Sequence, residues 1–251
     1  MNYTFQVAYL NTIRPKKVIP KNLLQEIENN KNIANLVSVL KEFKYTKIFL
    51  FSVPEISILD ATNFENVLLT ELYESLDLIS SLLLNNHKWF IEFLKFFINP
   101  TEIYSSNFVL FFEHYNKLFL KIKSNLCKKL FNLITDFENI KLFISYVITQ
   151  RTHQELIFIP FGSIDEKKLK QLFPSIESLN KFLNFSLYPK TKVSEKLQKE
   201  SINFYFNLYL EELIWQSRFY YFTIEPIVFY FFEKLIETQR LKKVYYTIKT
   251  V

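Results

Sequence analysis

The chain has 251 residues, enough to bury a substantial hydrophobic core as one large domain or as two smaller ones. Hydrophobic residues make up 49% of the sequence and aromatic residues 18%, which excludes a largely disordered protein. The formal net charge is +6, but lysine far outnumbers arginine, whereas proteins that read bases or phosphates favour arginine. The single cysteine, Cys127, excludes an internal disulfide framework and is expected to be a buried thiol.

The first half of the chain predicts a series of helices. Residues 1–17 form a short apolar segment, and two short helices with apolar residues on one face follow Pro20 and Asn30. Residues 46–60 contain a β-like run that Pro54 interrupts. Because no second strand signal lies near this run, we interpret it as a buried connector. Longer helices are expected over residues 63–84 and 89–98.

The second half of the chain continues the helical pattern. Two short helices follow Gly162 and end before Pro189, and Thr223 is expected to cap the last helix, with Pro226 in its first turn. Strict alternation of polar and apolar residues is nearly absent, so the sequence predicts an all-α fold. The long helices expected here span residues 105–128, 134–148, 192–218 and 224–249.

The segment 134–165 has the most distinctive sequence. Its apolar residues recur at steps of three and four, which places them in one stripe along a helix. Gly162, the only glycine in the chain, is expected to supply a backbone conformation that residues with a Cβ adopt at a cost. After it, Ser163 or Asp165 is expected to cap the next helix. The polar residues expected mostly on the outer face of the helix are Asp136, Glu138, Asn139, Lys141 and Gln150.

An internal echo at a constant offset of 145 residues relates two pairs of short helices. The matched positions are Ile19 with Ile164, Leu24 with Leu169, Ile27 with Leu172, Ala34 with Leu179, and Val37 with Phe182. Any two amphipathic helix pairs align tolerably, so the echo by itself is modest support for a repeat. Self-similarity of this kind is nevertheless typical of repeat architectures.

The sequence favours a protein without catalytic chemistry of its own. One glycine excludes the P-loop, the dinucleotide-binding fingerprint and the nucleophile elbow, each of which needs more than one. His87, His114 and His153 are isolated from one another and from cysteine, so no metal site is expected. We therefore expect no catalytic residue, no cofactor and no metal.

The chain is expected to be soluble and intracellular. No uncharged apolar run approaches the ~18 residues that a membrane-spanning helix needs. At the N-terminus, the basic residues Arg14, Lys16 and Lys17 follow the apolar part, which is the reverse of the order in a signal peptide.

Several ordered segments carry a resemblance to a known family. The first is Asp136-x-x-Asn139-Ile140-Lys141 on a helix, followed by a short loop, an apolar run and Gly162-Ser163-Ile164-Asp165. The others are Tyr3–Asn11, Ile19–Leu24, the looser Phe112–Leu118, and the closing Tyr221–Lys242. Together they resemble the C subunit of bacterial and archaeal rotary ATPases, called subunit d in the vacuolar enzyme. The closing segment is most similar to a short bacterial variant of that subunit.

The resemblance implies an all-α, funnel-like bundle of pseudo-repeated lobes in a V-type or A-type ATPase. Such a central-rotor subunit joins the shaft subunits, of the D and F type, to the membrane rotor ring, for ATP-driven ion or proton transport or for ATP synthesis. It has no cofactor and lies peripherally on the cytoplasmic face of the membrane. The chain is then one all-helical domain over residues 1–251, with expected lobes at 1–60 plus 190–251 and at 61–189.

Two groups of residues are candidates for a partner interface. The polar residues beside Ile140 and Leu241 are expected to point outward, either as a solvated helix face or as the lining of a socket for the shaft. The aromatic residues at 219–222 and 229–232 are too dense for one buried face, so they either pack between long helices or partly face a partner. The candidates are Asn139, Lys141, Arg240, Lys242, Asn116, Lys117, Tyr220 and Tyr221.

The positive charge motivates one alternative function. A helical binding module for nucleic acid or for an acidic protein partner would also carry a net charge of +6.

Overall fold

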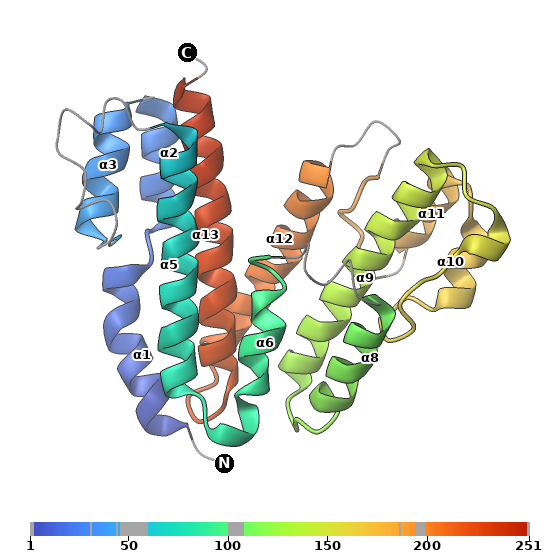
Figure 1. Cartoon of the computed structure of the whole chain (residues 1–251), viewed down its shortest axis with the longest axis horizontal. Helices are drawn as coiled ribbons and strands as arrows, with labels where there is room; N and C mark the ends of the chain where they lie inside the picture. The colour runs from blue at the N-terminus through green and yellow to red at the C-terminus, as the bar shows by residue number, and fades with distance from the viewer. Residues whose placement is uncertain are drawn as a thin grey trace. The chain divides into compact units, whose positions relative to one another are not determined.

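The structure is a computed structural model, and all of its described elements are helices (Figure 1). This confirms the predicted all-α fold. The described residues are 3–30, 32–43, 45, 60–99, 108–185, 187–193 and 199–249. The expected connector before Asp60 and the expected helix start at Ser105 lie outside them. Within these ranges, no helix combines the length and the apolar character that crossing a membrane requires.

The chain divides into two compact units by its internal contacts. Unit 1 comprises Met1–Pro100 and Gln216–Val251, and unit 2 comprises Thr101–Trp215. Unit 1 therefore joins the two ends of the chain, as one of the lobes expected from the sequence also does. The lobes expected from the sequence span residues 1–60 plus 190–251 and residues 61–189. These bounds and the expected funnel shape stay predictions.

Unit 1 is built around α13, which is the last helix of the chain. Every residue from Glu225 to Thr238 is buried, and a helix buried on all sides belongs at the centre of a bundle. In Figure 1, α5 runs beside α13, and α1, α2 and α3 also pack on it. The bounds are α1 Thr4–Lys17, α2 Lys21–Asn30, α3 Ile33–Glu42, α5 Ala61–Leu82, η2 Asn85–His87, α6 Trp89–Lys95 and α13 Glu225–Lys249.

Side-chain caps start two of the helices in unit 1. Asp60 caps α5 by accepting the Asn63 N–H at 2.7 Å, and Asn32 caps α3 in the same way. Two details differ from the prediction. Residues 4–17 form the helix α1, although only a short apolar segment was expected there. The residue before α13 is Ile224, whose carbonyl accepts the Val228 N–H, so the predicted cap Thr223 lies one position too early.

Unit 2 is built around α9, a helix of 24 residues. It packs against α8, while α10 and α11 pack against each other (Figure 1). Phe137 on α9 contacts Phe206 and Tyr209 on α12 edge-on or tilted, which joins α12 to the unit. The bounds are α8 Phe108–Phe119, α9 Asn125–Ile148, η3 His153–Glu155, α10 Glu166–Leu172, α11 Ile176–Phe185 and α12 Lys199–Ser217.

The single helix predicted over 105–128 is wrong, because the chain breaks between α8 and α9. Ser124 has an extended backbone, and its side chain accepts the Cys127 N–H at 3.0 Å. This serine therefore starts a new helix, as N-cap serines do. Cys127 is buried, as predicted.

Gly162 is required for a reason other than the predicted one. No glycine among the described residues has a positive φ, so the expected unusual backbone conformation is wrong. A Cβ at this position would instead overlap Oδ1 of Asp136 and lie 3.1 Å from its Cγ. The glycine thus allows the loop to approach a buried carboxylate. Asp165, rather than Ser163, caps α10 by accepting the Lys167 N–H at 2.8 Å.

We expect Gly162→Ala to lower the free energy of unfolding by about 2–3 kcal/mol, because the added methyl group displaces the Asp136 carboxylate. In an Asp136→Ala background, the same substitution should cost less than about 1 kcal/mol, since the overlapping atoms are gone. Denaturant unfolding of the four proteins of this cycle measures both values. An equal cost in the two backgrounds would contradict the steric explanation.

Candidate partner interface

The carboxylate of Asp136, on α9, is fully buried and fastens the loop that follows the helix. Its Oδ1 accepts the Ile164 N–H at 2.9 Å, and its Oδ2 accepts the Tyr188 O–H at 2.6 Å. Burial raises the pKa of Asp136 to about 6, and the hydrogen bond from Tyr188 offsets part of this rise. Burial and the neighbouring Asp136 also raise the pKa of Tyr188.

Asn139 lies one turn after Asp136 and holds the same loop at a second point. Its Nδ2 donates to the Ile159 carbonyl at 2.8 Å, and its Oδ1 accepts the Ile159 N–H at 2.7 Å. Both polar atoms of a fully buried side chain are therefore used within unit 2. The prediction that Asp136, Glu138 and Asn139 point outward is wrong, because all three are buried. The loop covers Asp136 and Asn139, to which it is bonded through Ile164 and Ile159.

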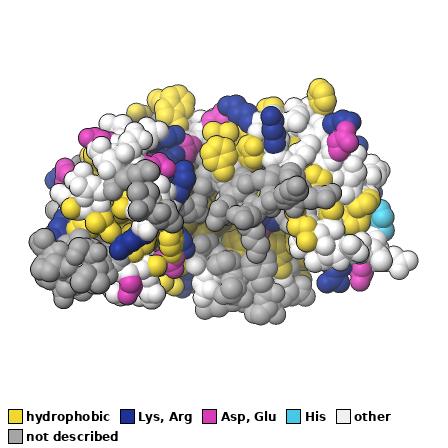
Figure 2. All heavy atoms as spheres, turned by 90° about the horizontal axis from the view of Figure 1, so that it is seen from above, with side chains coloured by type: hydrophobic (Ala, Val, Ile, Leu, Met, Phe, Trp, Pro, Cys, Tyr) yellow, Lys and Arg dark blue, Asp and Glu magenta, His cyan; other side chains and the backbone are white. Residues whose placement is uncertain are grey.

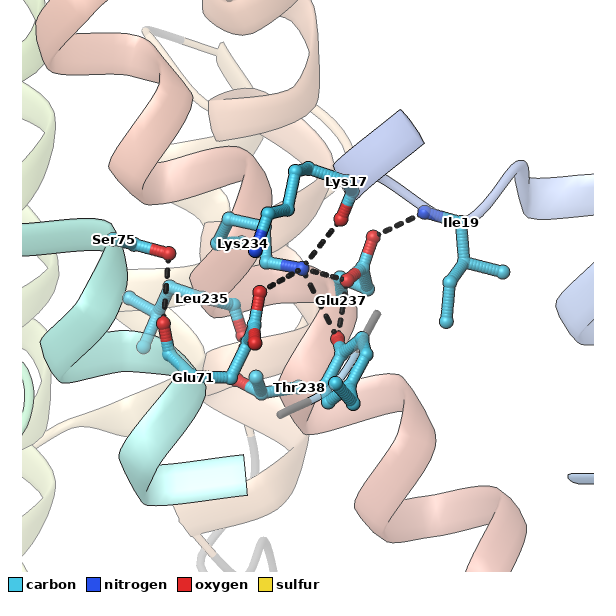
Figure 3. A network of polar contacts seen from close by, with 9 residues as sticks. Lys17, Ile19, Glu71, Ser75, Lys234, Leu235, Glu237 and Thr238 are labelled. Atoms are coloured by element: carbon cyan, nitrogen blue, oxygen red, sulfur yellow. Dashed lines mark hydrogen bonds and ion pairs between the residues drawn. The ribbon is translucent and has the colours of Figure 1, made fainter. Parts of the chain in front are cut away.

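A related arrangement lies in unit 1, around Glu237 on α13 (Figure 3). Oε2 of Glu237 accepts the Ile19 N–H at 2.6 Å, and its Oε1 accepts the Tyr45 O–H. The carboxylate is 3% exposed, and burial raises its pKa. The nearby Lys234 opposes this rise.

Lys234 is the cation of this cluster and has no exposed surface. Its Nζ donates to Glu237 and to the Lys17 carbonyl at 2.7 Å, and it lies 3.1 Å from Oε1 of Glu71 (Figure 3). It also lies 4.5 Å from the centre of the Tyr45 ring. A buried lysine is tolerated only with such partners, so α5, α13 and the segment between α1 and α2 are joined at one point.

The two carboxylates serve equivalent positions of the internal echo. Each accepts the backbone N–H of an isoleucine that precedes a pair of short helices, Ile19 in unit 1 and Ile164 in unit 2. Each also accepts the hydroxyl of a tyrosine that follows the pair, Tyr45 or Tyr188. The two pairs of short helices related by the sequence echo are thus held by similar hydrogen bonds. The helix that carries the carboxylate follows the pair of short helices in unit 1 and precedes it in unit 2.

The remaining polar candidates lie at or near the surface. Lys141 is 28% exposed and pairs with Glu138 at 2.7 Å, and Lys242 is 51% exposed and pairs with Glu65 at 2.6 Å. Arg240 is half-buried on α13, between Glu237 and Lys242 in sequence. Lys141 belongs to unit 2, whereas Arg240 and Lys242 belong to unit 1.

Asn116 and Lys117 lie on α8 in unit 2. Lys117 is exposed and pairs with Glu113 at 2.9 Å. Asn116 lines an open pocket between α8, α9 and the loop at Gly162, together with Lys128 and Asn132. Among the described residues, no group of three or more His, Cys, Asp or Glu side chains could hold a metal ion.

The aromatic residues divide between core and surface. The side chains at 229–232, within α13, are at most 1% exposed and belong to the core. Those at 219–222 are 40% to 61% exposed. Tyr220 and Tyr221, at 40% and 55%, are therefore accessible candidates. The sequence could not separate the two runs, because both consist only of phenylalanine and tyrosine and only the start of α13 at Glu225 divides them.

The basic side chains do not form a continuous surface on the face drawn in Figure 2. Among the described residues there, Lys and Arg side chains alternate with acidic and apolar ones. Several helical lysines are paired with an acid on their own helix, as in Lys117–Glu113, Lys170–Glu166 and Lys181–Glu177. This distribution gives the nucleic-acid alternative no specific support.

The family model for the ATP synthase (C/AC39) subunit matches residues 102–248, which is more than half of the chain. The chain belongs to this family. The match to the C/AC39 subunit covers the segment 134–165, including Asp136 and Gly162, and nearly all of α13. The segments Tyr3–Asn11 and Ile19–Leu24 lie outside it. No curated protein and no solved structure matches the chain.

Asp136 predicts a specific pH dependence of stability. Its pKa in the folded C/AC39 subunit, about 6, lies above its ordinary value of 3.8, so protonation stabilises the fold. This contribution is complete below pH ~4 and is lost as the pH rises through about 6. The difference in free energy of unfolding between the wild type and Asp136→Asn should fall by about 3 kcal/mol between these values. Urea unfolding at a series of pH values measures it, and a constant difference would contradict the assignment.

Lys234 predicts a large loss of stability on removal of its charge. Lys234→Met leaves Glu71 and Glu237 buried without a cation and should cost about 3–5 kcal/mol. Lys242→Met removes a half-exposed pair and should cost less than about 1 kcal/mol. Thermal or denaturant unfolding compares the two variants. Equal losses in the free energy of unfolding would show that the buried Lys234 cluster contributes no more to stability than an exposed ion pair.

Proposed function

We propose that the chain is a non-catalytic central-rotor subunit of a V-type or A-type ATPase. It couples the central shaft to the membrane rotor ring, for ATP-driven ion transport or for ATP synthesis. The observation that carries this proposal is the family match over residues 102–248. Its partners are the shaft subunits and the ring, and its place is the cytoplasmic face of the membrane.

The construction of each unit supports a mechanical role. A part that transmits torque must resist bending, and long helices packed along their length are stiff elements. In both units, a buried carboxylate on the longest helix also fixes a loop and a tyrosine from distant parts of the chain. These contacts tie the short helices to the long ones and reduce local opening.

The proposed contact residues are the accessible members of the candidate set. They are Lys141, Arg240, Lys242, Asn116, Lys117, Tyr220 and Tyr221. The buried Asn139 is excluded from them, because both of its polar atoms are bonded to Ile159. Lysines at the rim of an interface affect the rate of association more than its final strength, so several contacts have to be removed together.

The first test is purification of the tagged chain from native membranes. We expect the catalytic head, shaft and ring subunits of a rotary ATPase to accompany it. Recovery of the chain without any of these subunits would contradict the proposed function.

The second test uses two double variants that are matched in chemistry. Lys117→Ala with Lys242→Ala removes two exposed lysines of the candidate set, each paired with a glutamate. Lys170→Ala with Lys181→Ala removes two similarly paired lysines on α10 and α11 that are not candidates. We expect the first pair to lower recovery of the shaft subunits about fivefold and the second to leave it unchanged. Equal recovery of the shaft subunits with both double variants would show that Lys117 and Lys242 are not part of the interface.

A further inference from the structure

Three segments of unit 1 meet at one end of α13, and Tyr3 holds them together. The Tyr3 N–H donates to the Phe222 carbonyl at 3.0 Å, which joins the N-terminus to the connector that precedes α13. Its hydroxyl lies 2.7 Å from Nδ1 of His87 and accepts the Leu84 N–H at 3.3 Å, which adds the corner between α5 and α6. Tyr3 itself is 1% exposed, so the three segments are fixed by a buried side chain. In Figure 1 they lie together at the lower end of this unit.

This end exposes an unusual number of aromatic side chains. Phe219, Tyr220, Tyr221 and Phe222 are consecutive in sequence and are 58%, 40%, 55% and 61% exposed. Phe5, in the first turn of α1, is 79% exposed. We call these five residues the aromatic end. Large apolar side chains gathered on a surface mark a site of interaction, since isolated ones are common but groups are not.

The exposed charged side chains of the three segments are basic, and the next carboxylate on α6, that of Glu92, is paired with Lys95. Among the described residues of the three segments, 3–8, 83–91 and 217–225, the one carboxylate is that of Glu225, which is buried. Lys88 and Arg218 are exposed. Arg218 shares the buried Glu233 with Arg14, so two guanidinium groups face one carboxylate and this cluster adds to the positive charge.

The geometry points to a lipid partner: we propose that the aromatic end binds the headgroup region of an anionic bilayer. Tyrosine and phenylalanine side chains bury their rings at the boundary between headgroups and acyl chains, and basic residues beside them attract anionic lipids. Four of the five residues of the aromatic end lie in the short connector before α13. Side chains displayed on such a short segment are suited to shallow insertion among lipid headgroups.

This binding is distinct from the proposed function, because it needs no other subunit. In a rotary ATPase, it would place unit 1 against the lipid surface next to the ring. Tyr220 and Tyr221 would then contact lipid in addition to the protein partner proposed above.

The test is co-sedimentation of the whole chain with protein-free vesicles. One set contains phosphatidylcholine alone, and the other contains phosphatidylcholine mixed with anionic phosphatidylglycerol. We expect binding to the mixed vesicles to exceed binding to the neutral ones and to weaken with added salt. Lys88→Gln should lower binding to the mixed vesicles by up to about fivefold and leave binding to neutral vesicles unchanged.

Two matched variants test the aromatic side chains. Tyr221→Ser with Phe222→Ser should weaken vesicle binding about tenfold or more, because two exposed rings are lost from the aromatic end. Tyr73→Ser with Phe185→Ser removes rings that are 44% and 91% exposed elsewhere and should have no effect on binding. Circular dichroism and thermal melting verify that both variants are folded.

Three outcomes would overturn the lipid proposal. These are absence of vesicle binding by the wild type, equal binding by Tyr221→Ser with Phe222→Ser, and an equal loss in the control variant. If vesicles are not bound but the same substitutions prevent co-purification of ATPase subunits, the aromatic end is a protein interface. The function proposed above would then stand without lipid binding.

Discussion

A carboxylate buried inside a bundle of helices has to be hydrogen-bonded, and this requirement organises both units of the chain. Asp136 on α9 and Glu237 on α13 each accept a backbone N–H and a tyrosine hydroxyl from segments distant in the sequence. An unpaired group at either position would cost several kcal/mol. The loops therefore have to follow the paths on which their N–H groups reach the carboxylate, and the short helices are positioned as a consequence.

The two carboxylates meet the cost of burial in different ways. Glu237 has a cation beside it, since Lys234 binds the carboxylate directly and has no exposed surface. Asp136 has only neutral donors, and burial raises its pKa to about 6. The carboxylate that accepts the isoleucine N–H is thus part of an ion pair in one unit and a titratable hydrogen-bonded acid in the other. Gly162 is needed at the hydrogen-bonded Asp136, because only a residue without a Cβ lets the loop close over this carboxylate.

The sequence predicted those features of the fold that depend on local pattern. Apolar periodicity placed α5 and α13 within a few residues, and Asp165 was one of two expected caps of α10. Prediction from the sequence failed for side chains whose burial depends on residues distant in the sequence. Asp136 and Asn139 have the spacing of a solvated helix face, and nothing in that spacing indicates that the loop at 158–164 covers them. Lys234 is one lysine among many in the sequence, and its partners Glu71 and the Lys17 carbonyl are distant in the sequence.

The sequence predicted which residue types could form a partner interface, but it did not predict which of these residues lie at the surface. The aromatic density before and within α13 left open whether these side chains pack between helices or face a partner, and the division at Glu225 came from the structure. Phe5 was not a candidate, because a single phenylalanine near the N-terminus has no pattern of its own. It joins the aromatic end through Tyr3, whose backbone and hydroxyl link segments more than 80 residues apart.

The chain belongs to the C/AC39 family, and we propose that it is a mechanical link between the shaft and the ring. Electron cryo-microscopy of the intact rotary ATPase, purified from the native membrane, tests it most directly. The account predicts density for both helical units between the foot of the shaft and the rotor ring, with the ring joined to the shaft only through this chain. A complete enzyme in which the shaft contacts the ring directly and this chain is absent, or lies at the periphery, would contradict it.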